Sequence, residues 1–382
     1  MDQHKPKKNN LMHPSCHVNM FHVNVYEEAV ERVIKVIRSG YIGDGPVVKE
    51  LENNFATVSA TPLNLAVNSG TAALHLALIL AGVNAGDEVI TTAQTMMATS
   101  HAILMQRAIP VFADVQLRTG NIDPLDIEHR VSNRTKAILP VHWAGYPCDM
   151  DEIHAIAQQH NLVVIEDAAH AIGATYKGKT IGSISPMTCF SLQAIKHITS
   201  GDGGMLSLLR EEDRKLGFRL RWFGIDRDQR KPSILGEPEW NVTQLGYRYN
   251  MNDIAAAIAL GNLGHLQEIL EHRRKIAGEY REGLAGVPGI TLLEEKPDRK
   301  SAYWVFTLLV DRRIDFLRML QTRGIYASVV HLRIDRNDLY GGERRDLVNL
   351  ECFTKNHVSL PIHEGLTDED VQYILNAIRE GW

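Results

Sequence analysis

Short apolar runs alternate with helical patterns between about residue 60 and residue 210. The runs that predict strands cover residues 63–67, 88–91, 110–113, 137–141, 162–166, 188–191 and 205–208. Apolar residues at helical spacing predict helices over residues 71–80 and 150–160. Most of the strands are continuous apolar runs, as expected when helices cover both faces of a sheet. We therefore predict an α/β fold with a mostly parallel central sheet.

The pattern changes after about residue 250. A long helix is expected over residues 252–271, with an interruption near residues 261–264, and a strand over 303–310. Helices are expected over 314–323 and 368–380, and the polar, turn-rich residues 227–240 predict a surface loop. We predict a large domain over residues 1–265, including the N-terminal segment, and a smaller α+β C-terminal domain over residues 266–382.

Charge and composition exclude several classes of protein. The 382 residues include 41 Lys+Arg and 46 Asp+Glu, a net charge of −5, which gives no electrostatic footprint for nucleic acid. The lysines at positions 5, 7 and 8 are typical of a solvated tail. No run approaches the roughly 18 apolar residues that span a bilayer, and no apolar segment typical of a secretion signal follows the first lysines. We therefore expect no membrane association. The four cysteines form no CxxC pair, so we also expect no metal site and a cytoplasmic location.

Three segments at predicted strand ends carry candidate chemistry. The first reads NSGTA and contains Gly70, Thr71 and Ala72, where a strand gives way to a helix. Free N–H groups and the helix dipole make a helix N-terminus an anion site. Alone, the segment is better explained as a capped helix, with Ser69 or Thr71 as the cap.

The second segment places Glu166 and Asp167 at the end of a predicted strand, with His170 three residues later. Ligands of open parallel sheets bind at the carboxyl ends of strands, and a buried carboxylate needs a cation. Asp167 and His170 would share a face if a helix started at Asp167. A lone histidine is more often structural, so this pair by itself is only suggestive.

The third segment runs from Ser191 through Lys196 to a glycine-rich turn. Apolar residues flank Lys196, which favours partial burial, whereas a lysine at a sheet edge is usually solvated. A partly desolvated lysine has a lowered pKa and becomes a nucleophile toward carbonyl groups. An anion cradle, a carboxylate and a nucleophilic lysine are the parts that pyridoxal phosphate (PLP) requires.

The order of these motifs resembles the DegT/DnrJ/StrS family of sugar aminotransferases, of aspartate aminotransferase fold type I. The matching segments are NSGTAALHLAL, EDAAHAIGA and FSLQAIKHITSGDGGM, with SGYIGDGPVVKELE, GDEVITT, PVFADV, VHWAGYPCDMDEI, GYRYNMNDIAAAIA and SLPIHEGLTDEDV outside them. The resemblance covers about residues 20–380, and several long motifs in family order are highly specific.

The resemblance implies roles for the residues at the strand ends. Lys196 would hold PLP as the internal aldimine and then shuttle the proton, and Asp167 would pair with the pyridinium nitrogen. His170 stands where many members have Gln, and would contact the ring hydroxyl. The phosphate would be held by the segment of Gly70, Thr71 and Ala72 together with Ser191.

Other implied roles lie outside those strand ends. Asn250 would reach the phosphate of a neighbouring subunit in a homodimer with shared active sites, although Arg248 could make that contact instead. Met96 takes the place of an aromatic residue that stacks on the cofactor ring, and a thioether can pack against a ring face. The substrate would lie near Tyr41 and near a late segment that contains His331 and Arg333. Arg333 could meet a phosphate or carboxylate, or it could be a solvated arginine in a charged loop.

The predicted function is PLP-dependent transfer of an amino group, by a ping-pong mechanism, from an amino acid to a keto sugar. The resemblance implies L-glutamate as donor and a nucleotide-linked 3- or 4-keto-deoxysugar as acceptor. Sugar 3-dehydratases of this fold have His in place of the lysine, so Lys196 favours transamination. The alternatives are another PLP reaction on the same fold, such as dehydration, and a PLP-binding regulatory protein. The sequence does not distinguish the nucleotide, the sugar, the position of amination or the pathway.

Overall fold

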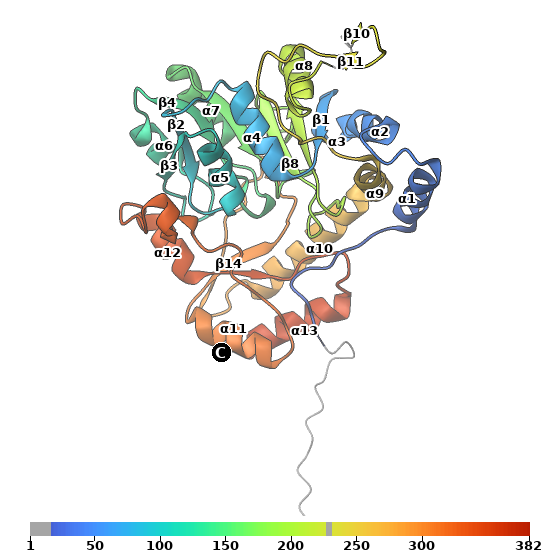
Figure 1. Ribbon diagram of the computed structural model, residues 1–382. Coiled ribbons are helices and arrows are strands. Elements are labelled where there is room, and N and C mark those ends of the chain that lie inside the picture. The colour runs from blue at the N-terminus through green and yellow to red at the C-terminus, as the bar shows by residue number, and fades with distance from the viewer. Residues whose placement is uncertain (1–16, 227–230) are drawn as a thin grey trace, which may run out of the picture.

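The computed structural model describes residues 17–226 and 231–382. The tail lysines, Cys16 and the first four residues of the loop predicted over 227–240 lie outside the described residues. Figure 1 shows a larger upper part built around a central sheet and a smaller lower part that contains the C-terminus.

A seven-stranded sheet forms the centre of the larger part. Its strands are β1 (Leu63–Val67), β2 (Glu88–Thr92), β3 (Ile109–Ala113), β4 (Thr135–Leu139), β5 (Val163–Asp167), β8 (Met187–Ser191) and β9 (Gly204–Leu208). Their order is β1-β9-β8-β5-β4-β2-β3, and only β9 is antiparallel to its neighbours, β1 and β8. The predicted α/β fold with a mostly parallel sheet is therefore confirmed.

Helices cover both faces of this sheet. The helices of the larger part are α1 (Glu27–Ser39), α2 (Pro46–Asn54), α3 (Ala56–Ser59), α4 (Gly70–Leu80), α5 (Met97–Met105), α6 (Pro124–Arg130), α7 (Met150–Gln159), α8 (Glu211–Leu220) and α9 (Asp253–Leu263). One apolar core contains Val48 of α2, Ile153 of α7 and Ala256 of α9, and a second contains residues of α4, α5 and α8. Burial on both faces explains why the strands are continuous apolar runs.

The smaller part begins with α10 (Leu266–Leu284), after the chain breaks its helix at residues 264–265, within one residue of the interruption predicted from the sequence. It continues with β12 (Ile290–Leu292), β14 (Phe306–Val310), α11 (Arg313–Thr322), α12 (Val348–Asn356), β15 (His357–Leu360) and α13 (Asp368–Arg379). The strands form an antiparallel sheet in the order β12-β14-β15. Its core contains Tyr280, Phe316 and Ile374, and Val18 of the N-terminal segment packs there too. The domain boundary at residue 265 stays a prediction.

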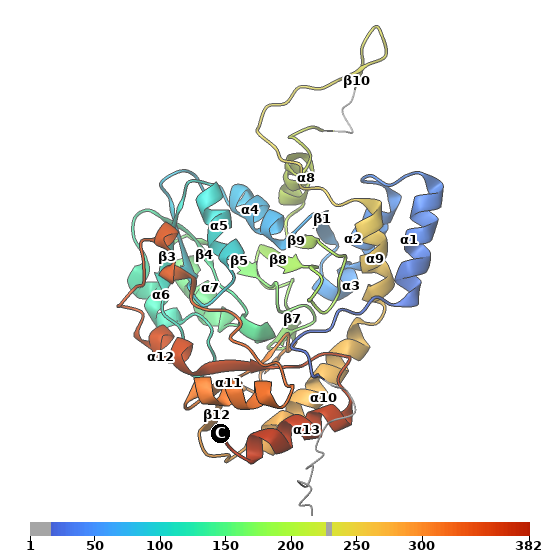
Figure 2. The same cartoon turned by 60° about the horizontal axis from the view of Figure 1, so that its bottom comes forward.

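Shorter elements complete the structure. They are β6 (Thr175–Tyr176), β7 (Lys179–Thr180) and β13 (Arg299–Lys300), the hairpin β10 (Lys231–Pro232) and β11 (Pro238–Glu239), and the 3-10 turns Trp143–Gly145, Ile334–Arg336 and Asp338–Tyr340. The hairpin projects far from the body of the protein (Figure 2). Within the described ranges, no helix is long and apolar enough to cross a membrane.

The topology brings several chain segments to one edge of the central sheet. β5 and β8 are parallel neighbours, so their carboxyl ends, at Asp167 and Ser191, lie at the same edge. β1 runs parallel to β8 because both are antiparallel to β9, and α4 begins just beyond β1. This edge is where an open α/β sheet binds its ligands.

Candidate active site

A cavity of about 380 Å³ lies at this edge of the sheet. The predicted residues that line it are Gly70, Thr71, Met96, Asp167, His170, Ser191, Lys196 and His331. Residues from β1–α4, β2–α5, β5, β8 and the smaller part thus meet around one space. The structure brings together most of the residues that the sequence singled out.

Lys196 follows β8 and is half-buried at the wall of this cavity. Its Nζ lies 3.6 Å from the ring centroid of Trp304, and the indole N–H of Trp304 donates to the carbonyl of Ile195 at 3.0 Å. Burial lowers the pKa of Lys196 to about 7, partly opposed by the Asp167 carboxylate. A large share of the amine is therefore uncharged near neutral pH, and only the uncharged amine is a nucleophile.

Asp167 ends β5 and is 4% exposed. Its Oδ1 accepts the backbone N–H of Ala169 at 3.1 Å, and its Oδ2 accepts the hydroxyl of Thr99 at 2.8 Å. Burial raises the pKa of this carboxyl, although both hydrogen bonds and the charge of Lys196 act against the rise. A carboxylate in this position gains from a cation placed in the cavity.

Glu166, the other acid of this pair, lies outside the cavity. Its Oε2 contacts Nε2 of His142 at 2.7 Å, and its Oε1 accepts the N–H of Ser185 at 2.9 Å. Nδ1 of His142 accepts the N–H of Cys148, so Nε2 carries the proton that is donated to Glu166. Burial acts to raise the pKa of Glu166, but the hydrogen bond from His142 and the others outweigh it and lower the pKa. Glu166 therefore has a complete set of partners.

His170 is buried beside Trp304, with ring centroids 3.8 Å apart and planes 11° from parallel. Its Nδ1 has no hydrogen-bond partner among the described residues. Burial lowers the pKa of His170 well below its usual value, so the ring is neutral. The chain makes turns after Asp167 instead of a helix, so the shared helical face considered for this pair is wrong. The two side chains meet at the cavity through the turn.

The start of α4 forms the opposite wall of the cavity. Ser69 caps the helix, because its hydroxyl accepts the N–H of Ala72 at 3.1 Å. The N–H groups of Gly70 and Thr71 have no acceptor inside the helix, whereas that of Ala72 is already used. A Cβ on Gly70 would lie 3.1 Å from the Cβ of Ser191, so glycine allows the helix to approach β8. The segment is a capped helix and also presents free donors to the cavity.

Two functional neighbours of the site escaped the sequence reasoning. Trp304 contacts both Lys196 and His170, but in sequence it is only one apolar residue of a predicted strand. Thr99 donates to Asp167, but in sequence it is only one threonine of the segment TMMAT, in which Met96 was the residue singled out.

Arg333 is bound inside the protein and does not line the cavity. Its guanidinium donates to both carboxylate oxygens of Asp335, at 2.7 and 2.6 Å, and to Glu351 at 2.8 Å. The side chains of Arg333 and Asp335 are fully buried. This geometry does not support the predicted substrate contact, and the arginine is not solvated either. Asp335 and Glu351 occupy its guanidinium group, and we therefore leave Arg333 out of the proposed site.

Tyr41 and Asn250 also lie away from the cavity within one chain. Tyr41 is exposed on the loop between α1 and α2. Asn250 forms a bridge with Val67, and its buried Oδ1 has no hydrogen-bond partner among the described residues. Arg248 packs over the ring of Trp222, with its Cζ 4.6 Å from the ring centroid. None of the three lines the cavity of its own chain.

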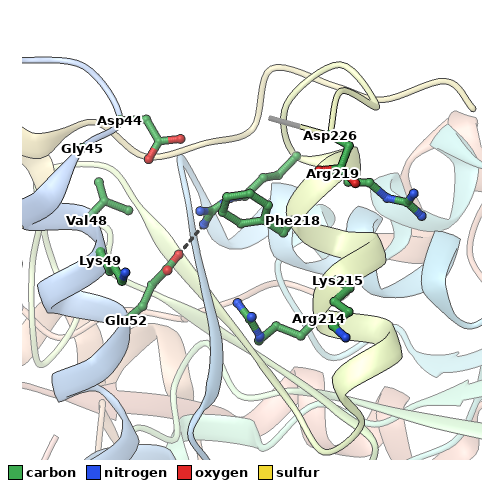
Figure 3. A pocket seen from close by; sticks show the side chains of 11 residues that line it. Asp44, Gly45, Val48, Lys49, Glu52, Arg214, Lys215, Phe218, Arg219 and Asp226 are labelled. Atoms are coloured by element: carbon green, nitrogen blue, oxygen red, sulfur yellow. Dashed lines mark hydrogen bonds and ion pairs between the residues drawn. The ribbon is translucent and has the colours of Figure 1, made fainter. Parts of the chain in front are cut away.

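A larger cavity of about 780 Å³ lies between α2 and α8 (Figure 3). Its walls carry both charges, and Arg214 extends from α8 toward Lys49 and Glu52 on α2. Arg221 forms an ion pair with Glu52 there and donates to the carbonyl of Ala66 at 2.7 Å. Volume alone therefore does not locate the chemistry, because the lysine with a lowered pKa lines the smaller cavity.

Comparison with known proteins gives consistent matches. The model of the DegT/DnrJ/EryC1/StrS aminotransferase family matches residues 24–379. The crystal structure of the sugar aminotransferase CalS13 from Micromonospora echinospora is 34% identical, covers 96% of this chain and all of its own, and has a TM-score of 0.91. The PLP form of Spr1654 from Streptococcus pneumoniae is 29% identical, covers 95% of this chain and 98% of its own, and has a TM-score of 0.88. The spore coat polysaccharide biosynthesis protein SpsC of Bacillus subtilis is 35% identical over 93% of this chain and 94% of its own.

Proposed function

The chain belongs to the DegT/DnrJ/EryC1/StrS aminotransferase family, and from this premise we propose that it transfers the amino group of L-glutamate to a nucleotide-linked keto sugar. The protein is a sugar aminotransferase, and its cofactor is PLP. The acceptor proposed is a 3- or 4-keto-deoxysugar, and the product is an amino sugar. SpsC acts in polysaccharide biosynthesis, and we propose a surface polysaccharide or a glycosylated natural product as the destination.

The residues around the cavity fit this cofactor. The free N–H groups of Gly70 and Thr71, with the nearby Ser191, suit a phosphate at a helix N-terminus. The Asp167 carboxylate suits a protonated ring nitrogen, because a cation there offsets the cost of its burial. Nδ1 of His170 is buried and without a partner in the described part of the chain, and suits the ring hydroxyl.

Each of these residues has a defined task in the proposed reaction. PLP supplies an electron-withdrawing ring that stabilises negative charge at the carbon next to the transferred amine. Lys196 would hold the cofactor through Nζ, and its amine, once released, would move a proton from the α-carbon of the donor to the cofactor carbon that carries the transferred nitrogen. Its pKa of about 7 suits a group that both accepts and donates a proton near neutral pH. Asp167 holds the ring nitrogen protonated, and Met96 packs at the cavity mouth.

The order of events is proposed to be ping-pong. Glutamate delivers its amino group first and leaves as 2-oxoglutarate, and the keto sugar then collects the amino group. Lys196 moves a proton in each half, in opposite directions. One cavity therefore binds the two substrates in turn, and the product of the first half-reaction must leave before the keto sugar binds.

A second subunit is proposed to complete the site. Among the described lining residues, Lys196 carries the only lysine or arginine side chain, yet both glutamate and a nucleotide diphosphate are anions. Arg248, Asn250 and Tyr41 lie outside the cavity of their own chain and would reach that of a neighbour. Two exposed apolar side chains, Leu235 on the projecting hairpin and Leu245 after it in the chain, favour contact with a second copy. We therefore propose a homodimer with shared active sites.

The observation that carries the proposal is the half-buried Lys196 amine in one cavity with Asp167 and the start of α4. The test incubates the PLP-loaded protein with ¹⁵N-labelled L-glutamate and with dTDP-, UDP- or GDP-linked 3-keto and 4-keto deoxysugars. The proposal predicts an amino sugar that carries ¹⁵N, formed in equal amount with 2-oxoglutarate, by mass spectrometry. Conversion of a keto sugar without 2-oxoglutarate would instead indicate dehydration. Transfer to a free keto sugar alone would remove the nucleotide from the proposal.

A further inference from the structure

A row of hydroxyl groups leads to the Asp167 carboxylate from the start of α5. Oγ1 of Thr99 lies 2.8 Å from Oδ2 of Asp167, and Oγ1 of Thr95 lies 2.7 Å from Oγ1 of Thr99. Both threonines are 1% exposed. Thr95 precedes α5 and Thr99 lies in its first turn, so the two hydroxyls meet where the helix begins. The row is therefore built into the protein interior.

The direction of these hydrogen bonds follows from the number of protons. An ionised carboxylate only accepts, so the single hydroxyl proton of Thr99 is donated to Asp167. Thr99 Oγ1 can then only accept from Thr95, whose hydroxyl must donate. Donation from Thr95 polarises the Thr99 hydroxyl and strengthens its bond to the carboxylate. The N–H of Ala169 fixes the other oxygen, Oδ1.

We propose that Thr99, supported by Thr95, is a positioning residue that holds the Asp167 carboxylate ionised and oriented toward the ring nitrogen of PLP. Buried without these donors, the carboxyl group would take up a proton or rotate, and either change would weaken its pairing with a protonated ring nitrogen. Two fixed donors, one on each oxygen, leave the remaining lone pairs for the cofactor. Both threonines also line the cavity, and the proposed effect of the hydroxyl row on the ring nitrogen passes through Asp167.

The inference deepens the proposed function, since it rests on PLP bound at Asp167, but it needs no sugar substrate. The test compares Thr99→Val, which removes the hydroxyl and keeps the branched shape, with Thr99→Ser, which keeps the hydroxyl. Each apoprotein is titrated with PLP and with 1-deaza-PLP, in which a CH group replaces the ring nitrogen. Binding is measured by quenching of tryptophan fluorescence, and thermal unfolding of each apoprotein checks its fold.

We expect Thr99→Val to bind PLP about tenfold more weakly than the parent, because one hydrogen bond to a charged group is lost. Its affinity for 1-deaza-PLP should equal that of the parent, and Thr99→Ser should keep at least most of the PLP affinity. Thr95→Val should weaken PLP binding by about threefold, since it acts one bond further away.

An equal loss for PLP and 1-deaza-PLP in Thr99→Val would overturn the inference, because it would mean that the threonine only packs the site. Unchanged PLP affinity in Thr99→Val would overturn it as well. If Thr99→Val failed to fold, the same comparison in Thr95→Val would decide. Failure of the protein to aminate any sugar would refute the proposed function but leave these affinities unaffected.

Discussion

Two clusters place a basic side chain near one or more carboxylates, and they differ in how completely their charges are matched. Around Arg333, the guanidinium contacts both oxygens of Asp335 and also Glu351, so every charged group has a partner. Around Lys196, the amine faces an indole ring, and the Asp167 carboxylate accepts one hydroxyl and one N–H from the described residues. The first cluster is complete without a ligand, and the second is not.

The difference teaches where a ligand is needed. A complete cluster stabilises the fold, and removing one member leaves a buried charge unpaired. An incomplete cluster costs stability in the free protein, and a bound cofactor recovers that cost. Burial disfavours the charged form of Lys196, and Asp167 offsets this only in part, so the pKa of Lys196 falls to about 7. The unmatched groups around Lys196 therefore identify the active site more reliably than cavity size does.

The largest expected effect is on activity, from Lys196→Ala. Loss of the amine removes both cofactor attachment and proton transfer, so the steady-state rate of transamination should fall at least about 10³-fold. Release of 2-oxoglutarate from glutamate measures it. Lys177→Ala is the control, since Lys177 is an exposed lysine paired with Asp151 and should leave the rate unchanged. A Lys196→Ala variant with full activity would contradict the account.

The next effect is on stability, from Arg333→Met. It leaves the buried Asp335 without its main partner, whereas Glu351 keeps its ion pair with Lys355. The free energy of unfolding should therefore fall by about 3–5 kcal/mol. Urea unfolding measures this change. Arg336→Met, which removes a more exposed partner of Glu343, should cost less than about 1 kcal/mol. A stable Arg333→Met protein with a raised KM for the sugar would return this arginine to the substrate site.

A smaller effect of opposite sign is expected for Lys196→Met in the apoprotein. The pKa of Lys196 is about 7 in the folded protein and near 10.5 when unfolded, so folding disfavours its charge. Below pH 7 the variant should be more stable by about 1–2 kcal/mol, after allowance for partial exposure. The gain should shrink as pH rises from 7 toward 10.5. Urea unfolding at pH 6 and pH 9.5 measures it, and equal gains at both values would contradict the lowered pKa.

The smallest effect is expected for Gly70→Ala. The added Cβ would lie 3.1 Å from the Cβ of Ser191, so α4 and β8 must separate at the phosphate donors. PLP affinity should fall about tenfold through this overpacking. Equilibrium dialysis of the apoprotein measures it, with pyridoxal as the control, because pyridoxal has no phosphate. An equal loss for pyridoxal would show that Gly70 acts on the whole cavity and not on the phosphate.

Most of the central sheet was predictable because its strands are buried on both faces. The predicted runs at 63–67 and 205–208 match β1 and β9 to within a residue, because apolar residues dominate each run and only Asn64 and Ser207 interrupt them. The meeting of Gly70, Asp167 and Lys196 was also predictable, because the carboxyl ends of parallel strands share an edge. The assignment of roles still required the family resemblance, since each motif alone had an ordinary structural explanation.

The remaining features depend on contacts that no local pattern encodes. Trp304 lies 108 residues after Lys196, and its contact with the amine depends on how the smaller part packs on the sheet. The role of Arg333 was ambiguous, because the same neighbouring charged residues in the sequence can form either a solvated loop or a buried ion-pair cluster. Tyr41 and Asn250 do not line the cavity of their own chain, so their predicted roles stay predictions, as does the cytoplasmic location.

Reductive trapping tests the central claim most directly. The PLP-loaded protein is treated with sodium borohydride, which makes the link between PLP and an amine permanent, and is then digested with trypsin. The account predicts that the label lies on Lys196 and blocks cleavage there, so that residues 180–210 appear as one phosphopyridoxyl peptide in the mass spectrum. Separate unlabelled peptides 180–196 and 197–210, with the label on another lysine or absent, would contradict it.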